Sequence, residues 1–204
     1  MACEGNGMSD ERIGEALIKE VIQEELKDVP REDVPPLTPV TGKVKEEEEK
    51  VVNQLAKITR IIGDRVKDDA ELKDAIDGFI GCPSSCSMSD RFKEVANKVL
   101  ESGITWERIA VLFYVAGKLA HRMVEAHIPQ SVRDILRWTM EFFRINLLGW
   151  IREHGGWINS FSDLATVSMQ SVSSMSSQSS ALALIFISGL AIGSFISWRL
   201  TRQS

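Results

Sequence analysis

Apolar positions recur at helical spacing through most of the chain, and runs typical of strands are nearly absent. Between residues 46 and 66 they fall at intervals of four, three, four and four, at Val51, Leu55, Ile58, Ile62 and Val66. This spacing predicts an amphipathic helix with one narrow apolar face. Gly63 interrupts the pattern, and because glycine inside a helix costs about 1 kcal/mol relative to alanine, we expect a close approach there.

Two features suggest where helices begin near the N-terminus. Ser9 precedes a stripe that starts at Ile13, and serine is a favoured N-cap, so we expect that helix to begin at Ser9. Four glutamates at 46–49 are typical of a solvated first turn, where acidic side chains are favourable.

The most apolar part of the body lies between residues 104 and 126. From Ile109 to Ala116 its only polar side-chain group is the Tyr114 hydroxyl, and a helix of that length would be about 34 Å long. A second apolar helix is expected from Pro129 to beyond Trp150. The two predict a central hairpin, which is either a core pair of an ordinary bundle or a hairpin that can enter a membrane interface when the bundle opens.

The C-terminal part carries no charge between Asp163 and Arg199. Residues 181–198 would form a helix about 27 Å long, enough to cross most of a bilayer core, so we expect a transmembrane tail anchor at 181–199. The alternative is a helix docked on the protein's own surface. The expected membrane-facing residues are Leu182, Ile185, Phe186, Ile187, Leu190, Ile192, Ser194, Phe195, Ile196 and Trp198.

The segments around the body differ in composition. Residues 160–180 contain ten serines, so we interpret 164–180 as a flexible tether rather than an extension of the preceding helix. Residues 1–8 lack the basic start and apolar run of a secretory signal and are expected to be a flexible N-terminus. The helical domain is expected to span residues 9–163.

Charge and residue usage exclude several classes of function. The net charge is −5, with 14 acidic and 7 basic residues in the first 50, which argues against a nucleic-acid-binding protein. Cys82 and Cys86 have no histidine nearby, and three cysteines do not suggest a disulfide framework, so we expect reduced thiols and no metal site. Three scattered histidines and the lack of a phosphate-binding glycine loop argue against an enzyme, and no cofactor is expected.

Three segments resemble, in order, the motifs of one known family. LAKITRIIGDRV at 55–66 resembles the third homology motif, or death motif, of the B-cell lymphoma 2 family of apoptosis regulators. WERIAVLFYVAGKLA at 106–120 resembles the first motif, and LLGWIREHGGW at 147–157 the second. The resemblance places these motifs at about 55–69, 98–117 and 150–165. It implies an all-α bundle of eight to nine helices around a central hydrophobic hairpin, with a C-terminal tail-anchor helix.

The resemblance also implies which residues act. The death-motif helix would use Leu55, Ile58, Thr59, Ile62, Gly63, Asp64 and Val66. The groove that receives such helices would be formed by Trp106, Arg108, Ile109, Leu112, Phe113, Trp150, Gly155, Gly156 and Trp157. Asp64 would pair with Arg108 of a partner, a contact that fixes register in an otherwise apolar interface.

Two positions depart from the family pattern. Thr59 stands where the family's characteristic leucine anchor is expected, and the lost burial is worth about 1.5–3 kcal/mol. Either Ile58 rotates into the pocket or death-motif binding is weaker. Glu107 replaces the glycine usually found between Trp106 and Arg108, so its carboxylate can compete for that arginine.

The implied function is that of a pro-apoptotic effector that is activated by death-motif helices, forms homodimers and higher oligomers, and permeabilises the mitochondrial outer membrane. It would be cytosolic at rest and move to outer-membrane lipid on activation. One alternative is a survival-type member that sequesters death-motif helices without forming pores. Another is a tail-anchored adaptor that does not permeabilise membranes.

Overall fold

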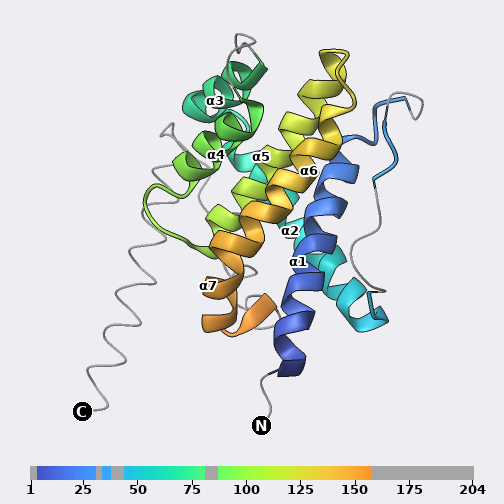
Figure 1. Ribbon diagram of the computed structural model, residues 1–204, viewed down its shortest axis with the longest axis vertical. Coiled ribbons are helices and arrows are strands. Elements are labelled where there is room, and N and C mark those ends of the chain that lie inside the picture. Colours follow the sequence, from blue (N-terminus) through green and yellow to red (C-terminus); the bar gives the residue numbers. More distant parts are fainter. Residues whose placement is uncertain (1–3, 31–33, 38–43, 81–86, 158–204) are drawn as a thin grey trace.

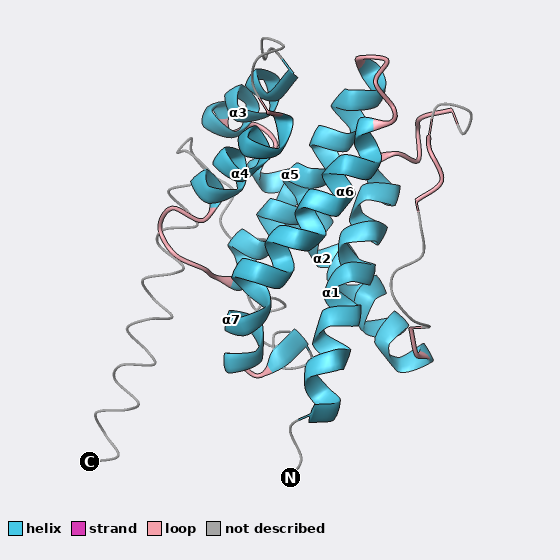
Figure 2. Ribbon diagram, in the orientation of Figure 1, coloured by secondary structure: helices cyan, strands magenta, loops and turns pink. Residues whose placement is uncertain are grey.

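The computed structural model describes residues 4–30, 34–37, 44–80 and 87–157, and this part of the chain is all helix and loop (Figure 2). Its elements, in chain order, are α1 (Glu4–Glu25), α2 (Glu46–Val66), α3 (Ala70–Ile80), α4 (Met88–Val99), α5 (Trp106–Glu125), α6 (Ser131–Phe142), η1 (Phe143–Leu147) and α7 (Leu148–Glu153). The prediction of an all-α fold is confirmed. None of the described helices is both long and apolar enough to cross a bilayer. The expected tether and tail anchor lie outside the described residues.

Helix α5 occupies the centre of the bundle. Fourteen of its twenty residues are buried, and it packs against α1, α2, α3, α4 and α6. Figure 1 shows α1 and α6 side by side across it, with the α3–α4 pair to one side. The hydroxyl of Thr105 accepts a hydrogen bond from the backbone N–H of Arg108 at 3.3 Å, which caps the first turn. The predicted apolar hairpin therefore forms the core of the described bundle.

The second arm of the hairpin is α6, continued by the π-helical segment η1 and then α7. It begins at Ser131, two residues after Pro129, so the proline precedes the helix rather than opening it. Phe142 and Phe143 are both buried although they are consecutive. Phe142 lies 6.4 Å from the Phe92 ring on α4, and Phe143 lies 6.2 Å from the Phe113 ring on α5. The wider π turn allows neighbouring residues to face two different partners.

The expected helix start at Ser9 is wrong, and the expected solvated start at residues 46–49 holds for three of its four glutamates. Helix α1 begins at Glu4, so Ser9 is inside it and does not cap it. The Ser9 hydroxyl instead donates to Glu48 Oε1 at 2.9 Å. Glu48 is only 7% exposed, unlike its three neighbours in the run, because it also pairs with Arg12. The acidic run thus supplies a solvated helix start and one buried contact to α1.

Candidate functional site

The segment that resembles a death motif is the C-terminal half of α2, and its apolar face is turned into the bundle. Leu55, Thr59, Ile62 and Val66 are buried, on a helix that packs against α1 and α5. Ile58 is half-buried and Asp64 is exposed. The structure therefore places Thr59, rather than Ile58, on the buried face of the resting molecule.

Gly63 brings α2 into close contact with α5. A β-carbon built on Gly63 would lie 2.2 Å from Cδ2 of Tyr114 and 2.6 Å from its Cγ. A separation this short is forbidden, so only glycine fits beneath the tyrosine ring. The predicted close approach is found here, within the chain itself.

An apolar groove lies between α3, α4 and α5. Its cavity volume is about 30 Å³, and it is partly open to solvent. Its lining comprises Leu72 and Ala75 of α3, Val95 and Val99 of α4, and Val111 of α5, with Glu71, Lys98 and Arg108. Lys98 Nζ lies 3.6 Å from Glu71 Oε2 and so joins the charged residues of α3 and α4. Its lining is mostly apolar, which is the kind of surface that the apolar face of an amphipathic helix contacts.

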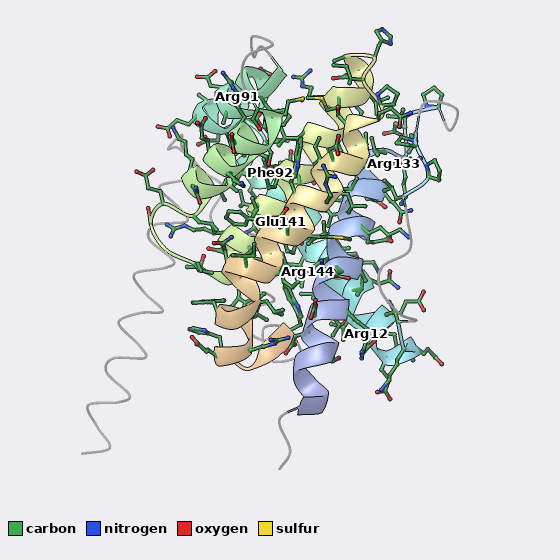
Figure 3. The ribbon with its side chains drawn as sticks, in the orientation of Figure 1. Arg12, Arg91, Phe92, Arg133, Glu141 and Arg144 are labelled. Carbon is green, nitrogen blue, oxygen red and sulfur yellow. The ribbon has the colours of Figure 1, made fainter. Side chains whose placement is uncertain are left out.

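Most of this lining was not predicted from the sequence. The relevant signals were the short apolar stripe around Leu72 and Ala75 and the Val95–Val99 pair on the next helix. Each stripe indicates a helix, but neither shows that the two helices meet. Phe92 points from α4 toward α6, where its ring lies 6.2 Å from that of Trp138 (Figure 3). This contact holds α4 beside the hairpin.

Arg108 lines the groove. It is 7% exposed, and its Nη1 donates to the carbonyl oxygen of Gly103 at 2.8 Å. Burial lowers the pKa of the Arg108 guanidinium, and the neighbouring Glu107 carboxylate partly offsets that effect. Asp64 lies in a different pocket, which Lys67, Tyr114 and Lys118 also line. The two residues expected to pair between molecules thus lie in separate pockets of one molecule.

Several of the expected groove residues form an aromatic cluster instead of an open wall. The Trp106 ring lies 5.1 Å from that of Trp150 and 5.4 Å from that of Trp157. Phe113 and Trp157 are 6.3 Å apart, and both are at most 2% exposed. Ile109 and Leu112 are each 1% exposed. In the resting molecule these side chains join α5 to the end of the second motif.

The Gly155–Gly156 turn attaches that cluster to α1. Both glycines have positive φ, at 90° and 73°, and a β-carbon on Gly156 would lie 2.6 Å from Asp10 Oδ1. The backbone N–H of Trp157 donates to Asp10 Oδ1 at 3.1 Å, and its indole N–H donates to the Asp10 carbonyl oxygen at 2.9 Å. Burial raises the pKa of Asp10. The sequence predicted these two glycines as groove residues, and it gave no sign of Asp10, which lies 147 positions before Trp157.

Charged contacts hold α1 against both α2 and the hairpin. Arg12 Nη2 lies 2.7 Å from Glu48 Oε1, and the Lys45 backbone N–H donates to Glu48 Oε2 at 3.0 Å. The hydrogen bond from Arg12 is the main reason that the pKa of Glu48 falls to about 2. On the other side, Arg144 of η1 pairs with Glu15 and Glu11 of α1. Arg12 and Arg144 both lie along α1 in Figure 3.

Comparison with known proteins decides the family. The family described as "Apoptosis regulator proteins, Bcl-2 family" matches residues 40–157, more than half of the chain. The chain belongs to the Bcl-2 family of apoptosis regulators. The Bcl-2 match begins just before α2 and ends at Trp157, so it contains the three motif-like segments at 55–66, 106–120 and 147–157 and the groove lining.

Relatives and solved structures agree with this family. The chain is 29% identical to the apoptosis regulator BAX of Bos taurus over 163 residues, which is 79% of this chain and 77% of that protein. It is 30% identical to human BAX over 147 residues, 72% of this chain and 69% of that protein. A crystal structure of Trichoplax adhaerens trBcl-2L2 bound to trBak BH3 has a TM-score of 0.59 and 21% identity. It covers 76% of this chain and 97% of its own. The last comparison shows the shared fold.

Proposed function

We propose that this Bcl-2 family protein is a pro-apoptotic effector of the BAX type. Activated by death-motif helices, it forms homodimers and larger oligomers and permeabilises the mitochondrial outer membrane. Similarity to BAX across most of both chains supports the effector class. The protein would be cytosolic at rest and would move to the mitochondrial outer membrane on activation.

The observation that carries the proposal is the position of the death-motif face. Leu55, Ile62 and Val66 are at most 4% exposed, so another molecule cannot contact this face until α2 separates from α1 and α5. The central helix α5 is likewise mostly covered, because fourteen of its twenty residues are buried. Both the death-motif face and the apolar hairpin are buried inside the bundle. On activation these surfaces would leave the bundle and be buried again against another protein and against lipid, which suits an effector with two states.

The α3–α4–α5 groove is the proposed receiver of a death-motif helix. The related trBcl-2L2 structure contains a bound BH3 helix, which supports helix binding in this chain. Arg108 lines the groove, so an acidic residue such as Asp64 on the incoming helix can pair with it. The aromatic cluster of Trp106, Trp150 and Trp157 would close the neighbouring end. Residues 181–199 would anchor the active form in lipid, with 164–180 as the tether.

The experiment is a dye-release assay with the full chain. Liposomes of outer-mitochondrial lipid composition, loaded with dye, are incubated with the protein and a death-motif peptide that carries leucine at the anchor position. We expect release that depends on both peptide and protein. Capture of the peptide without release under any activator would instead identify a survival-type protein.

One observation favours the survival-type alternative. Thr59 gives the chain's own death motif a polar group at its anchor position, which weakens self-association but leaves the groove able to bind other helices. Asp64→Ala distinguishes both family functions from a non-permeabilising adaptor. An adaptor keeps full activity in this variant, and also in Arg108→Ala, whereas a groove-dependent protein does not.

A further inference from the structure

A second cavity lies between α1, α2 and α5, apart from the α3–α4–α5 groove. Residues of α1, of the turn that follows it and of α2 form its walls, and Tyr114 is the residue that α5 contributes. Its volume is about 280 Å³, just below the range of about 300–1,000 Å³ that is usual for small-molecule sites. The space therefore suits a small ligand.

The α2 wall of this cavity includes Thr59, the position at which the chain departs from the leucine expected in a death motif. Asn53 of the same helix also lines the cavity. A leucine at position 59 would make this wall apolar, whereas threonine adds a hydroxyl group that both donates and accepts hydrogen bonds. The residue that weakens the apolar stripe thus makes the cavity more polar.

Two of the acidic lining residues are already neutralised within the protein. Glu24 pairs with Lys27, and its Oε1 lies 3.2 Å from Arg60 Nη1 of α2. Glu25 Oε2 lies 2.7 Å from Lys118 Nζ of α5. These pairs join α1 to the other two helices around the cavity, and they leave little net charge for a ligand to meet there.

Glu20 on α1 and Lys57 on α2 are the two remaining charged residues of the lining. Neither forms an ion pair with any residue that the structure describes. Glu20 is half-buried and Lys57 is exposed, so the cavity presents one available carboxylate and one available ammonium group on different helices. A ligand with both charges can form a charge-assisted hydrogen bond with each of them.

The same cavity also has apolar surface, at Val21, Ala56 and the ring of Tyr114. Apolar surface combined with a few polar groups that fix orientation is typical of small-molecule sites. We propose that the cavity binds a small zwitterion of the amino-acid or short-peptide class. Its ammonium group pairs with Glu20, its carboxylate pairs with Lys57, and its apolar part lies against these three residues.

A molecule bound there contacts α1 and α2 at the same time. Its contacts are lost when α2 separates from α1, so the ligand binds the resting form and stabilises it by mass action. The binding site does not depend on the proposed function. Its effect on activation does, because it assumes that α2 leaves the bundle when the effector becomes active.

The test is a titration of the full-length resting protein with three zwitterions that differ in charge separation: L-leucine, glycyl-leucine and 6-aminohexanoate. N-acetyl-leucine and leucinamide are control ligands, since each lacks one of the two charges. Binding is followed by the shifts of backbone amide signals in nuclear magnetic resonance spectra, and stability by the melting temperature. The variants are Glu20→Gln, Lys57→Met and Ala56→Leu, with circular dichroism to confirm folding.

We expect at least one zwitterion to shift signals of α1 and α2 around the cavity. At about ten times its Kd it should raise the melting temperature by about 3–6 °C. Glu20→Gln and Lys57→Met should each weaken binding at least about tenfold, as should loss of either ligand charge. Ala56→Leu should abolish binding, because the larger side chain occupies the cavity. Lys50→Met, on α2 but outside the lining, should stay within about twofold of wild type.

The failure of this inference differs from the failure of the proposed function. If no zwitterion shifts these signals, or if Glu20→Gln and Ala56→Leu bind as wild type does, the site is wrong, whatever the protein does to liposomes. If dye release occurs but is equally fast with and without saturating ligand, the stabilising role is wrong. A protein that binds the zwitterion as expected but never releases dye keeps the site and loses the effector function.

Discussion

Gly63 shows how a single missing side chain sets the distance between two helices. The Tyr114 ring occupies the space where a β-carbon would be, so α2 and α5 approach more closely than larger residues allow. The same tyrosine is 5.2 Å from Lys118 Nζ, measured to its ring centroid. Tyr114 is therefore fixed from two sides and has little room to yield.

We predict that Gly63→Ala destabilises the resting monomer by about 1–3 kcal/mol, the usual effect of overpacking a close contact. The expected fall in melting temperature is about 3–10 °C, measured by circular dichroism. Gly149→Ala is the matched control, because its β-carbon would have no atom within 4 Å. An unchanged melting temperature for Gly63→Ala would show that the ring moves aside freely.

The sequence predicts this residue only in part. A glycine within an amphipathic stripe indicates that something approaches closely, but the pattern does not identify Tyr114, which is 51 positions away in the sequence. Asp10 shows the same limit more strongly. Its pairing with Trp157 joins the two ends of the described bundle, and one acidic residue among many near the N-terminus gives no sign of it.

Helix α1 contacts both the death-motif helix α2 and the hairpin through polar and charged side chains. It contacts α2 through Ser9 and Arg12, which hold Glu48, and contacts η1 through Glu15. Glu48 is the acid at the third position of α2, and it also accepts from the Lys45 backbone N–H that precedes the helix. The Glu48 carboxylate thus both caps the N-terminus of α2 and binds α2 to α1.

Glu48→Gln should weaken the contact between α1 and α2, and the size of this effect should depend on pH. The pKa of Glu48 is lowered in the fold from 4.5 to about 2, so its contribution is present above pH 4.5 and is lost as the pH falls toward 2. We expect the variant to lose about 2 kcal/mol at pH 7 in urea unfolding. The difference from wild type should shrink steadily below pH 4.5.

Glu47→Gln is the control for this experiment, because Glu47 is exposed in the same run of glutamates. The free energy of unfolding of Glu47→Gln should match that of wild type both at pH 7 and near pH 2. A loss in Glu48→Gln that is equally large near pH 2 would mean that the carboxylate charge is not what binds α1 to α2.

The elements themselves follow closely from periodicity, whereas their junctions do not. The stripe in 46–66 and the apolar run from Ile109 predicted α2 and α5 because burial of one face or of a whole helix leaves a pattern in neighbouring residues. Helix α1 starts five residues before Ser9 because tertiary contacts with Glu48 take up the serine hydroxyl. The groove forms where α3 packs beside α4. The sequence of neither helix shows that the two are in contact, so the groove could not be predicted from the pattern.

The bundle that the structure describes has α5, which carries the apolar run from Ile109 to Ala116, at its centre. Helix α5 touches five other helices, so exposing it requires the bundle to come apart rather than to flex. A membrane-active form therefore needs a second apolar environment at the moment of opening, and the tail at 181–199 is the expected means of reaching one.

We predict that Ser194→Glu reduces membrane association of the full chain about a hundredfold, because a carboxylate within a membrane span costs about 2.5–3.5 kcal/mol. Deletion of 181–204 should have at least as large an effect. Partitioning onto mitochondria is measured by fractionation after a death stimulus. Ser204→Glu, beyond the span, is the control. A truncated chain that still collects on mitochondria would contradict the anchor.

The π-helical segment η1 has a consequence for everything that follows it. It gives the chain one extra residue per turn just where Phe142 faces α4 and Phe143 faces α5. Removal of that surplus residue would rotate α7 by about a third of a turn. Trp150 would then swing away from Trp106, and the Gly155–Gly156 turn would no longer deliver Trp157 to Asp10. This local irregularity therefore sets the rotation of α7 about its axis, and with it the contacts that Trp150 and Trp157 make with Trp106 and Asp10.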